Sequence, residues 1–257
     1  MNRVLFSVLL LVFVTLSFSG VKIVPTDYST IQAALDAATD GDIIKIQNDV
    51  FGYYEDLTLS GKNHLLIESY GNEHPAIGAN NSSIVLRIIN CQNIVIKDLG
   101  FGAGTNGVAI NITQGSSNIK VIGCAIEGIW QTENNIGIQN AGNYLTVENC
   151  SLTGLYKGVY SSGKSPTVNN CIIRAHYGVQ LSSITSTATI ENNTIDSWIY
   201  GIRISSNYVD VKNNTINRVV PAAYSIYNYS GTCYSSGNTF TCNDGTTSRF
   251  SGIIINY

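Results

Sequence analysis

The residues of this sequence that could bind or act on a ligand lie in a recurring phrase of the form Gly-Val-x-Ile. If each copy of the phrase forms a strand, the third place points outward and holds a varied set of side chains. That set is Ala109, Gln139, Tyr160, Gln180, Arg203 and, in the related stretch YSIY, Tyr227. Further aromatic and imidazole side chains lie beside it, namely Tyr156, His176, Tyr177, Trp198 and Tyr200.

A row of tyrosine, glutamine and arginine side chains suits a sugar polymer. Aromatic rings take the apolar faces of pyranose rings, whereas amide and guanidinium groups take hydroxyl and carboxylate groups. The alternative is that tyrosine simply favours the half-buried surface of a β-sheet. We predict a binding set that consists of Tyr160, Gln180, Tyr200, Arg203 and Tyr227.

Some side chains near this row could also catalyse a lyase-type reaction. Arg203, His176 or Tyr177 could abstract or return a proton, and Arg174 could neutralise a uronate carboxylate. The alternative for Arg174 is a salt bridge with Asp196 of the next repeat. No cluster of carboxylates supports a calcium site, and the histidines and cysteines are too dispersed for zinc. We therefore expect no cofactor.

A second phrase shows which elements position these residues. It begins at Ile96, Val121, Val147, Val168, Ile190, Val211 and Ser235, so successive starts lie 25, 26, 21, 22, 21 and 24 residues apart. A period in the low twenties is typical of a solenoid, in which equivalent residues of neighbouring coils stack about 4.8 Å apart. The fourth place of the phrase holds Cys124, Cys150, Cys171, Asn193, Asn214 and Asn238. We predict a ladder of inward asparagines there, with cysteine as a compact apolar substitute.

The segment before the repeats predicts a short helix that covers the open core of the first coil. Ser29 could cap a helix from Thr30 to Ala38, which would bury one apolar face and end at Gly41. A strand from Ile43 to Ile46 follows.

The stretch YSTIQAALDAATDGDIIKIQNDVFGYYEDLTL, the following LLIES and PAI, and the column of VxNCxI and IxNNTI phrases resemble the pectin-lyase-like, right-handed parallel β-helix superfamily. The resemblance implies an all-β, single-stranded right-handed parallel β-helix with an N-terminal capping helix. The superfamily includes polysaccharide lyases, polygalacturonases, alginate epimerases, phage tailspikes and many proteins without known activity, so it implies the fold but not the chemistry.

The site motifs of the superfamily's enzymes are missing from the sequence. It contains no Asp-Asp or Gly-His-Gly of the polygalacturonases and no Asp-Pro-His-Asp of the alginate epimerases. The nearest match to the polygalacturonase Arg-Ile-Lys is Arg203-Ile204-Ser205, which lacks the lysine. Binding is therefore predicted more firmly than cleavage, and the sequence leaves open whether the protein is an enzyme.

The sequence contains six cysteines that could form disulfides. Cys233 and Cys242 flank a Gly-Asn-Thr turn and form the best candidate pair. Cys150 and Cys171 lie within disulfide range if they stack, but buried thiols are the preferred interpretation there. Cys91 has no evident partner.

The N-terminus and the composition indicate where the protein is located and which classes of partner are expected. Residues 1–20 pair Arg3 with an apolar run and small residues, which predicts a signal peptide ahead of a β-helix domain at 21–257; a retained anchor is the alternative. The net charge is −3 and no basic run occurs, so nucleic acid is not an expected partner, and no membrane contact is expected after cleavage. We expect a secreted, periplasmic or cell-surface protein.

These observations predict an exported β-helix protein that engages a polysaccharide along its lateral face. The alternative is a structural or adhesive surface protein, in which the solenoid is a rigid rod that self-assembles through its coil ends. The missing acid pairs and the shortage of long inserted loops favour this alternative.

Overall fold

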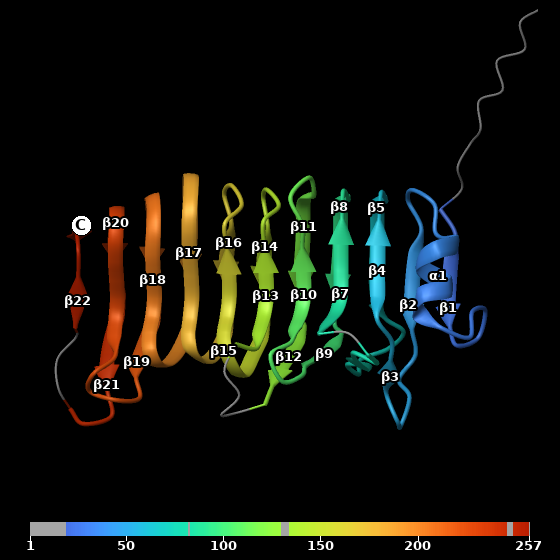
Figure 1. Cartoon of the computed structure of the whole chain (residues 1–257), viewed down its shortest axis with the longest axis horizontal. Coiled ribbons are helices and arrows are strands. Elements are labelled where there is room, and N and C mark those ends of the chain that lie inside the picture. The colour runs from blue at the N-terminus through green and yellow to red at the C-terminus, as the bar shows by residue number, and fades with distance from the viewer. Residues whose placement is uncertain (1–18, 82, 130–133, 246–248, 257) are drawn as a thin grey trace, which may run out of the picture.

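The computed structural model describes residues 19–81, 83–129, 134–245 and 249–256. They form an all-β parallel solenoid of about nine coils. The strands stand side by side along one axis (Figure 1), and every pairing between described strands is parallel. The predicted fold class is therefore confirmed.

Each coil contributes to three faces, and face A carries the predicted binding residues. Face A consists of β4 (Leu57–Ser60), β7 (Ile84–Ile89), β10 (Val108–Ile112), β13 (Ile136–Asn140), β22 (Phe250–Ser251) and parts of the long strands β15 (Ser151–Ser161), β17 (Ile172–Glu191), β18 (Thr194–Lys212) and β20 (Tyr224–Ser236).

Face B contains the repeated six-residue phrase. Its separate strands are β1 (Val21–Val24), β2 (Ile43–Ile46), β5 (Asn63–Ser69), β8 (Gln92–Lys97), β11 (Ser117–Ile122), β14 (Thr146–Glu148), β16 (Thr167–Asn169) and β23 (Ile254–Asn256), and β17, β18 and β20 complete it.

Face C follows face B in each coil after a short turn. Its separate strands are β3 (Tyr53–Tyr54), β6 (Ala76–Gly78), β9 (Gly100–Ala103), β12 (Ala125–Gly128), β19 (Thr215–Arg218) and β21 (Thr239–Cys242), and the first residues of β15, β17 and β18 complete it. In these three long strands the chain passes from face C to face A around a corner where the register shifts, as between Ala175 and Tyr177.

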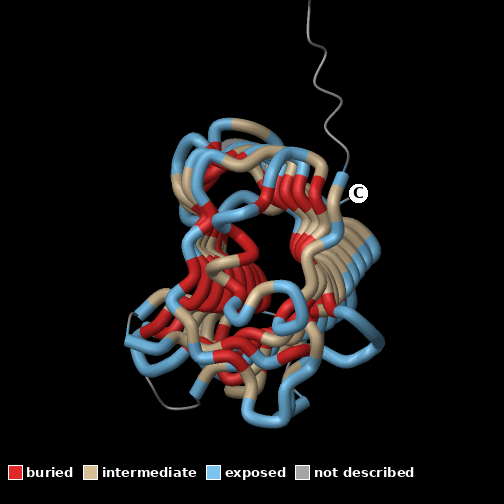
Figure 2. Tube along the Cα trace, turned by 90° about the vertical axis from the view of Figure 1, so that its right-hand side faces the viewer, coloured by how far each residue is buried: buried red, intermediate tan, exposed pale blue. Residues whose placement is uncertain are grey.

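The core is a set of apolar columns that run along the solenoid axis. On face B, Val121, Val147, Val168, Ile190 and Val211 stack in register and are at most 1% exposed. Seen along the axis, the buried positions of successive coils overlap along the inner sides of the coil walls (Figure 2). The repeat of valine and isoleucine is thus the sequence signature of a wall that buries one side of every strand.

The predicted asparagine ladder is confirmed. The Asn193 Nδ2 donates to Asn214 Oδ1 at 2.9 Å, and Asn214 Nδ2 donates to Asn238 Oδ1 at the same distance. The ladder joins the cysteine part of the column, because Cys171 N donates to Asn193 Oδ1 at 2.9 Å. At the turn between faces B and C, the buried amides of neighbouring coils therefore satisfy one another's hydrogen-bonding groups.

The capping helix is present, and its first residue differs from the prediction by one. Helix α1 (Ile31–Ala37) begins after Thr30, whose hydroxyl accepts a hydrogen bond from Ala33 N at 3.1 Å. The cap is Thr30 rather than Ser29 because Thr30 has the extended backbone that precedes a helix. The Glu55 carboxylate of a neighbouring coil adds a second cap, since it accepts from Ile31 N at 2.9 Å. Figure 1 shows α1 beside β1 and β2 at the N-terminal end.

The predicted disulfide between Cys233 and Cys242 is wrong in this structure, where all six cysteines are free thiols. Cys233 is buried on face B and pairs with Val209, whereas Cys242 ends β21 on face C and pairs with Arg218. The eight residues between them carry the chain around a turn of the last coils, so the two thiols belong to different faces. The preferred interpretation of Cys150 and Cys171 as buried thiols is confirmed.

Residues 1–18 of the predicted signal peptide lie outside the described residues. Within the described residues, no helix combines the length and the apolar character needed to cross a bilayer.

Candidate functional site

The register of face A brings four of the five predicted binding residues into one line. Arg87, Asn111, Gln139, Tyr160, Gln180, Arg203 and Tyr227 occupy equivalent places in successive coils and are called the polar column here. Ala109 was assigned to this line wrongly, because it is fully buried and Asn111 takes the outward place. Arg87 is a member that the sequence phrase did not reveal, since its coil lacks the glycine.

A second outward line runs beside the polar column. Lys157, Tyr177, Tyr200 and Tyr224 stack in register and are called the tyrosine column. It continues towards the N-terminus as Ile136, Val108 and Ile84. The predicted binding residue Tyr200 therefore lies next to the polar column rather than in it.

The aromatic rings of the two columns contact one another across coils. Ring centroids lie 5.3 Å apart for Tyr177 and Tyr200, 4.8 Å for Tyr200 and Tyr227, and 5.1 Å for Tyr224 and Tyr227. These spacings are those of favourable tilted and edge-to-face pairs. The rings are half-buried, so each keeps some surface open to solvent. Face A thus carries a set of aromatic side chains, which we call the aromatic patch: Tyr160, Tyr177, Tyr200, Tyr224 and Tyr227. The last four form a connected series of ring contacts.

Three cations lie over this patch. One of them, Arg249, has its guanidinium carbon 4.1 Å from the ring centroid of Tyr224, and the other two, Lys157 and Arg203, belong to the two columns. Lys157 Nζ lies 4.9 Å from the ring centroid of Tyr160, and the Arg203 guanidinium carbon lies 5.9 Å from that of Tyr200. Neither Lys157 nor Arg203 forms an ion pair with any described residue. Burial and the charge of Arg203 lower the pKa of Lys157 from its ordinary value. The two columns contain no aspartate or glutamate, so nothing in them neutralises these charges.

Gln180 is one of the face A residues with a buried polar atom that has no hydrogen-bond partner among the described residues. It lies between Tyr160 and Arg203 in the polar column and is only 8% exposed. Its Oε1 atom is buried without a hydrogen-bond partner. A buried acceptor without a donor costs about 1–3 kcal/mol, and such groups in folded proteins usually have a partner. A hydrogen-bond donor from a bound molecule would give this oxygen atom a partner.

The predicted catalytic candidates are spread over three places. Arg174 lies on face C, where its Nε donates to Asp196 Oδ2 at 3.1 Å, so the salt-bridge alternative is confirmed. His176 lies at the corner between Tyr156 and Trp198, with ring centroids 5.4 and 6.0 Å away, in a different line from Arg203. Burial, with a further effect of the Tyr156 hydroxyl, raises the pKa of Tyr177 to about 12. Tyr177 therefore keeps its proton at neutral pH and is a hydrogen-bond donor rather than a base.

Among the described residues, no group of three or more His, Cys, Asp or Glu side chains could hold a metal ion. The chemistry that face A offers consists of ring stacking, a buried amide oxygen without a hydrogen-bond partner, and four cations without an ion pair among the described residues: Arg87, Lys157, Arg203 and Arg249.

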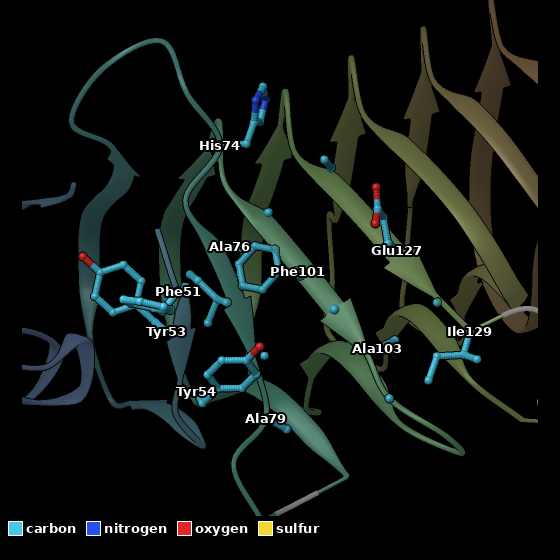
Figure 3. Close-up of a pocket in the computed structure, with 18 of the residues that line it drawn as sticks. Phe51, Tyr53, Tyr54, His74, Ala76, Ala79, Phe101, Ala103, Glu127 and Ile129 are labelled. Atoms are coloured by element: carbon cyan, nitrogen blue, oxygen red, sulfur yellow. The ribbon is translucent and has the colours of Figure 1, made fainter. Parts of the chain in front are cut away.

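A separate cleft lies on face C near the N-terminal end, and the sequence reasoning missed it. It has a volume of about 790 Å³ and crosses β3, β6, β9 and β12. Its floor consists of small residues, including Ala76, Gly78 and Gly102. In Figure 3, Phe51 and Tyr54 stand on one side of it and Glu127 and Ile129 on the other. The signal in the sequence is a pair of stacked glycines where a strand would ordinarily present side chains.

Solved structures share this architecture. A pectin methylesterase from carrot aligns with a TM-score of 0.67 and 15% identity, over 92% of this chain and 87% of its own. An alginate lyase from Paenibacillus sp. str. FPU-7 gives 0.61 and 13%, over 92% and 99%. A pectate lyase from Bacillus sp. N165, in complex with trigalacturonate, gives 0.61 and 14%, over 90% and 84%. A search of curated protein sequences finds no match.

The fold and these likenesses define the class as a right-handed parallel β-helix, which is the fold that the resemblance to the pectin-lyase-like superfamily implies. Residues 106–256 match the model of the right handed beta helix region, and the chain belongs to that family.

Proposed function

We propose that the protein is exported and binds an acidic polysaccharide along face A. In this proposal the aromatic patch stacks on the sugar rings and Lys157 and Arg203 bind uronate carboxylates. The Gln180 side chain turns outward on binding, so that a sugar hydroxyl donates to its Oε1 atom. The observation that carries the proposal is the row formed by Tyr160, Gln180 and Arg203, which combines a ring, a buried unpartnered acceptor and an unpaired cation in adjacent coils.

The electrostatics of the two columns support an acidic rather than a neutral polymer. The chain as a whole has a net charge of −3, yet the two columns carry cations and no acids. A carboxylate placed between Lys157 and Arg203 would relieve the repulsion that lowers the pKa of Lys157. The similar carrot, Paenibacillus and Bacillus proteins are a pectin methylesterase, an alginate lyase and a pectate lyase, which adds weight to a polysaccharide partner.

Cleavage by a lyase-type reaction is the finer part of the proposal. It requires a base that removes the proton next to the uronate carboxyl group, while the bond to the leaving oxygen breaks and that oxygen takes up a proton. Tyr177 is a poor base because its pKa is raised to about 12. His176 and Arg203 remain the candidates, and they lie in separate lines. Binding is therefore the activity that the geometry of face A supports best.

The test is retention of the purified protein on immobilised polysaccharides, with polygalacturonate and alginate as the acidic polymers and the variant Arg203→Ala as the probe. We expect retention on an acidic polymer and at least about tenfold weaker binding by Arg203→Ala. Arg174→Ala is the matched control, because it removes the same group from an ion pair on face C. Equal loss in both variants, or no retention of the wild type, would refute the proposal. Ultraviolet absorbance of unsaturated products, measured in the same samples, reports cleavage.

A structural rod is the second candidate function. It is favoured by the apolar residues of the last described coil, where Ile253 is 64% exposed and Ile255 is 42% exposed. β23 pairs with β20 on one side and leaves its other edge open among the described strands. A lack of retention on every polymer, together with concentration-dependent assembly in light scattering, would favour this function.

A further inference from the structure

The cleft on face C has the size and walls of a ligand site. Its volume of about 790 Å³ lies within the usual range of small-molecule sites, about 300–1,000 Å³. Phe51 is 85% exposed and Tyr54 is 68% exposed, although both are large aromatic residues on the rim of an open hollow. Figure 3 shows that β6 and β9 form the floor between these rings and Glu127. Two exposed rings beside a flat floor are the elements of a stacking site.

The fold does not require the glycine that keeps the centre of the floor low. Gly102 has no left-handed backbone, and a Cβ added to it would meet nothing closer than Ile77 O at 4.0 Å. Gly100 differs, because its added Cβ would press on the His74 and Pro75 carbonyl oxygens at 3.3 Å. A glycine inside a strand weakens the strand and often marks close approach by a ligand. The cleft at Gly102 is therefore open at a cost in stability.

The charge of the cleft is opposite to that of face A. Its lining contains no lysine or arginine. Glu127 is its one carboxylate, and it forms no ion pair with a described residue. His74 is held at the rim, where its Nε2 donates to Gly123 O at 2.8 Å. A carboxylate accepts hydrogen bonds from hydroxyl groups and repels other carboxylates. The cleft therefore disfavours a uronate and suits an uncharged polyhydroxylated ligand.

We propose that this cleft is a second carbohydrate site, which binds a short neutral oligosaccharide. The sugar rings lie flat on the floor at Gly102, the rings of Phe51 and Tyr54 contact their apolar faces, and Glu127 accepts from their hydroxyl groups. The inference goes beyond the proposed function, because it concerns another face, another set of residues and a ligand of another charge class.

Titration calorimetry with cellohexaose, mannohexaose and xylohexaose tests the proposal. We expect at least one of them to bind the wild type and Gly102→Val to bind it at least about tenfold more weakly, because the valine fills the floor. Thr153→Val is the matched control: Thr153 lies two coils further along the same outward line as Gly102, outside the cleft. The melting temperature of Gly102→Val should equal or exceed that of the wild type, since a β-branched residue replaces a strand glycine. A loss of binding then reports the cleft rather than the fold.

Two further variants separate this site from face A. Glu127→Gln should weaken the neutral ligand while leaving binding to acidic polymers unchanged, and Arg203→Ala should leave the neutral ligand unchanged. The proposal is overturned if none of the three hexasaccharides binds, or if Gly102→Val binds as the wild type does. It is also overturned if Arg203→Ala, but not Gly102→Val, loses the neutral ligand. None of these results depends on whether acidic polymers bind face A.

Discussion

At the scale of residues, face A differs from the rest of the scaffold in what its polar groups lack. Elsewhere the inward amides from Asn193 to Asn238 are joined by hydrogen bonds, and the exposed Arg174 forms an ion pair with Asp196. Among the described residues, no group donates a hydrogen bond to Gln180 Oε1, and no carboxylate forms an ion pair with Arg203. A stack of parallel coils brings such groups into line at no extra cost, because each coil repeats the backbone of the one before.

Replacing Gln180 separates binding from folding. Gln180→Met keeps the length of the side chain and removes the unpartnered acceptor, so the free energy of unfolding should rise by about 1 kcal/mol. Affinity for the acidic polymer should fall, since the sugar hydroxyl loses its acceptor. Urea denaturation and titration calorimetry measure the two effects.

Gln139→Met is the control for this prediction, because Gln139 lies in the same column but is only half-buried. It should change the free energy of unfolding by less than about 0.5 kcal/mol. A strongly destabilised Gln180→Met would mean that the Gln180 amide supports the coil itself, and would remove it from the binding set.

At the scale of elements, the sequence predicted the coils well because each coil repeats its buried positions. The register of face B matches every phrase start from Ile96 to Ser235. Ala109 was placed in the wrong column because Gly107 resembles the glycine of the later coils but has a different structural role. Gly107 N donates to Gly104 O in a turn, whereas Gly137 points inward, where a Cβ would meet Gly158 O at 2.7 Å.

The site was less predictable than the fold for a related reason. Sequence patterns show which side chains point outward, but whether a given arginine has an acid beside it depends on register and side-chain direction. The sequence repeat placed Asp196 beside Arg174, but only the structure shows that Arg203 has no ion pair with a described residue and lies over the Tyr200 ring. The cleft was missed because its signal is the absence of side chains at Gly78 and Gly102, which a search for reactive groups passes over.

The junction between β1, α1 and β2 predicts acid sensitivity. Asp42 is 1% exposed and accepts from Gly20 N, Thr39 N and Lys22 Nζ at 2.7, 2.7 and 2.6 Å. Burial raises the pKa of Asp42, but the hydrogen bonds from Lys22, Thr39 and Gly20 outweigh it and leave that pKa well below the ordinary value. Because the folded pKa is the lower one, the stability that Asp42 contributes is present above about pH 4 and is lost as pH falls below it.

Asp42→Asn should therefore lower the free energy of unfolding at pH 7 by about 2–3 kcal/mol. Its difference from the wild type should shrink as the pH is lowered from about 4 towards 2. Urea denaturation across this range measures the difference. Asp36→Asn is the control, since Asp36 is exposed and its carboxylate accepts a hydrogen bond from Gln32 Nε2 at 2.7 Å within the same helix. A constant difference for Asp42→Asn at all pH values would contradict this account.

At the scale of the whole molecule, the two proposed ligand surfaces lie on different faces of the solenoid and have opposite character. Face A is cationic and aromatic towards the C-terminal coils, and the cleft on face C carries a carboxylate towards the N-terminal coils. A long scaffold with a shared core lets the two surfaces vary independently, because substitutions far apart in the structure act additively on stability.

Salt distinguishes the two surfaces in a single protein. Raising the salt concentration from about 50 mM to 500 mM should weaken binding of polygalacturonate several-fold, because it screens Lys157 and Arg203. Binding of a neutral hexasaccharide should change by less than about twofold, since no charge is neutralised there. Calorimetric titrations at both concentrations give the comparison. Salt-insensitive binding of the acidic polymer would argue against a role for the two cations.

The polar and tyrosine columns run along the solenoid axis, across the strands rather than along them (Figure 1). Each coil therefore adds one step of about 4.8 Å to face A. If face A binds a polymer as proposed, the number of coils that carry rings and cations sets the length of polymer that is bound. A duplicated or deleted coil would lengthen or shorten the bound stretch by one step without changing the rest of the surface.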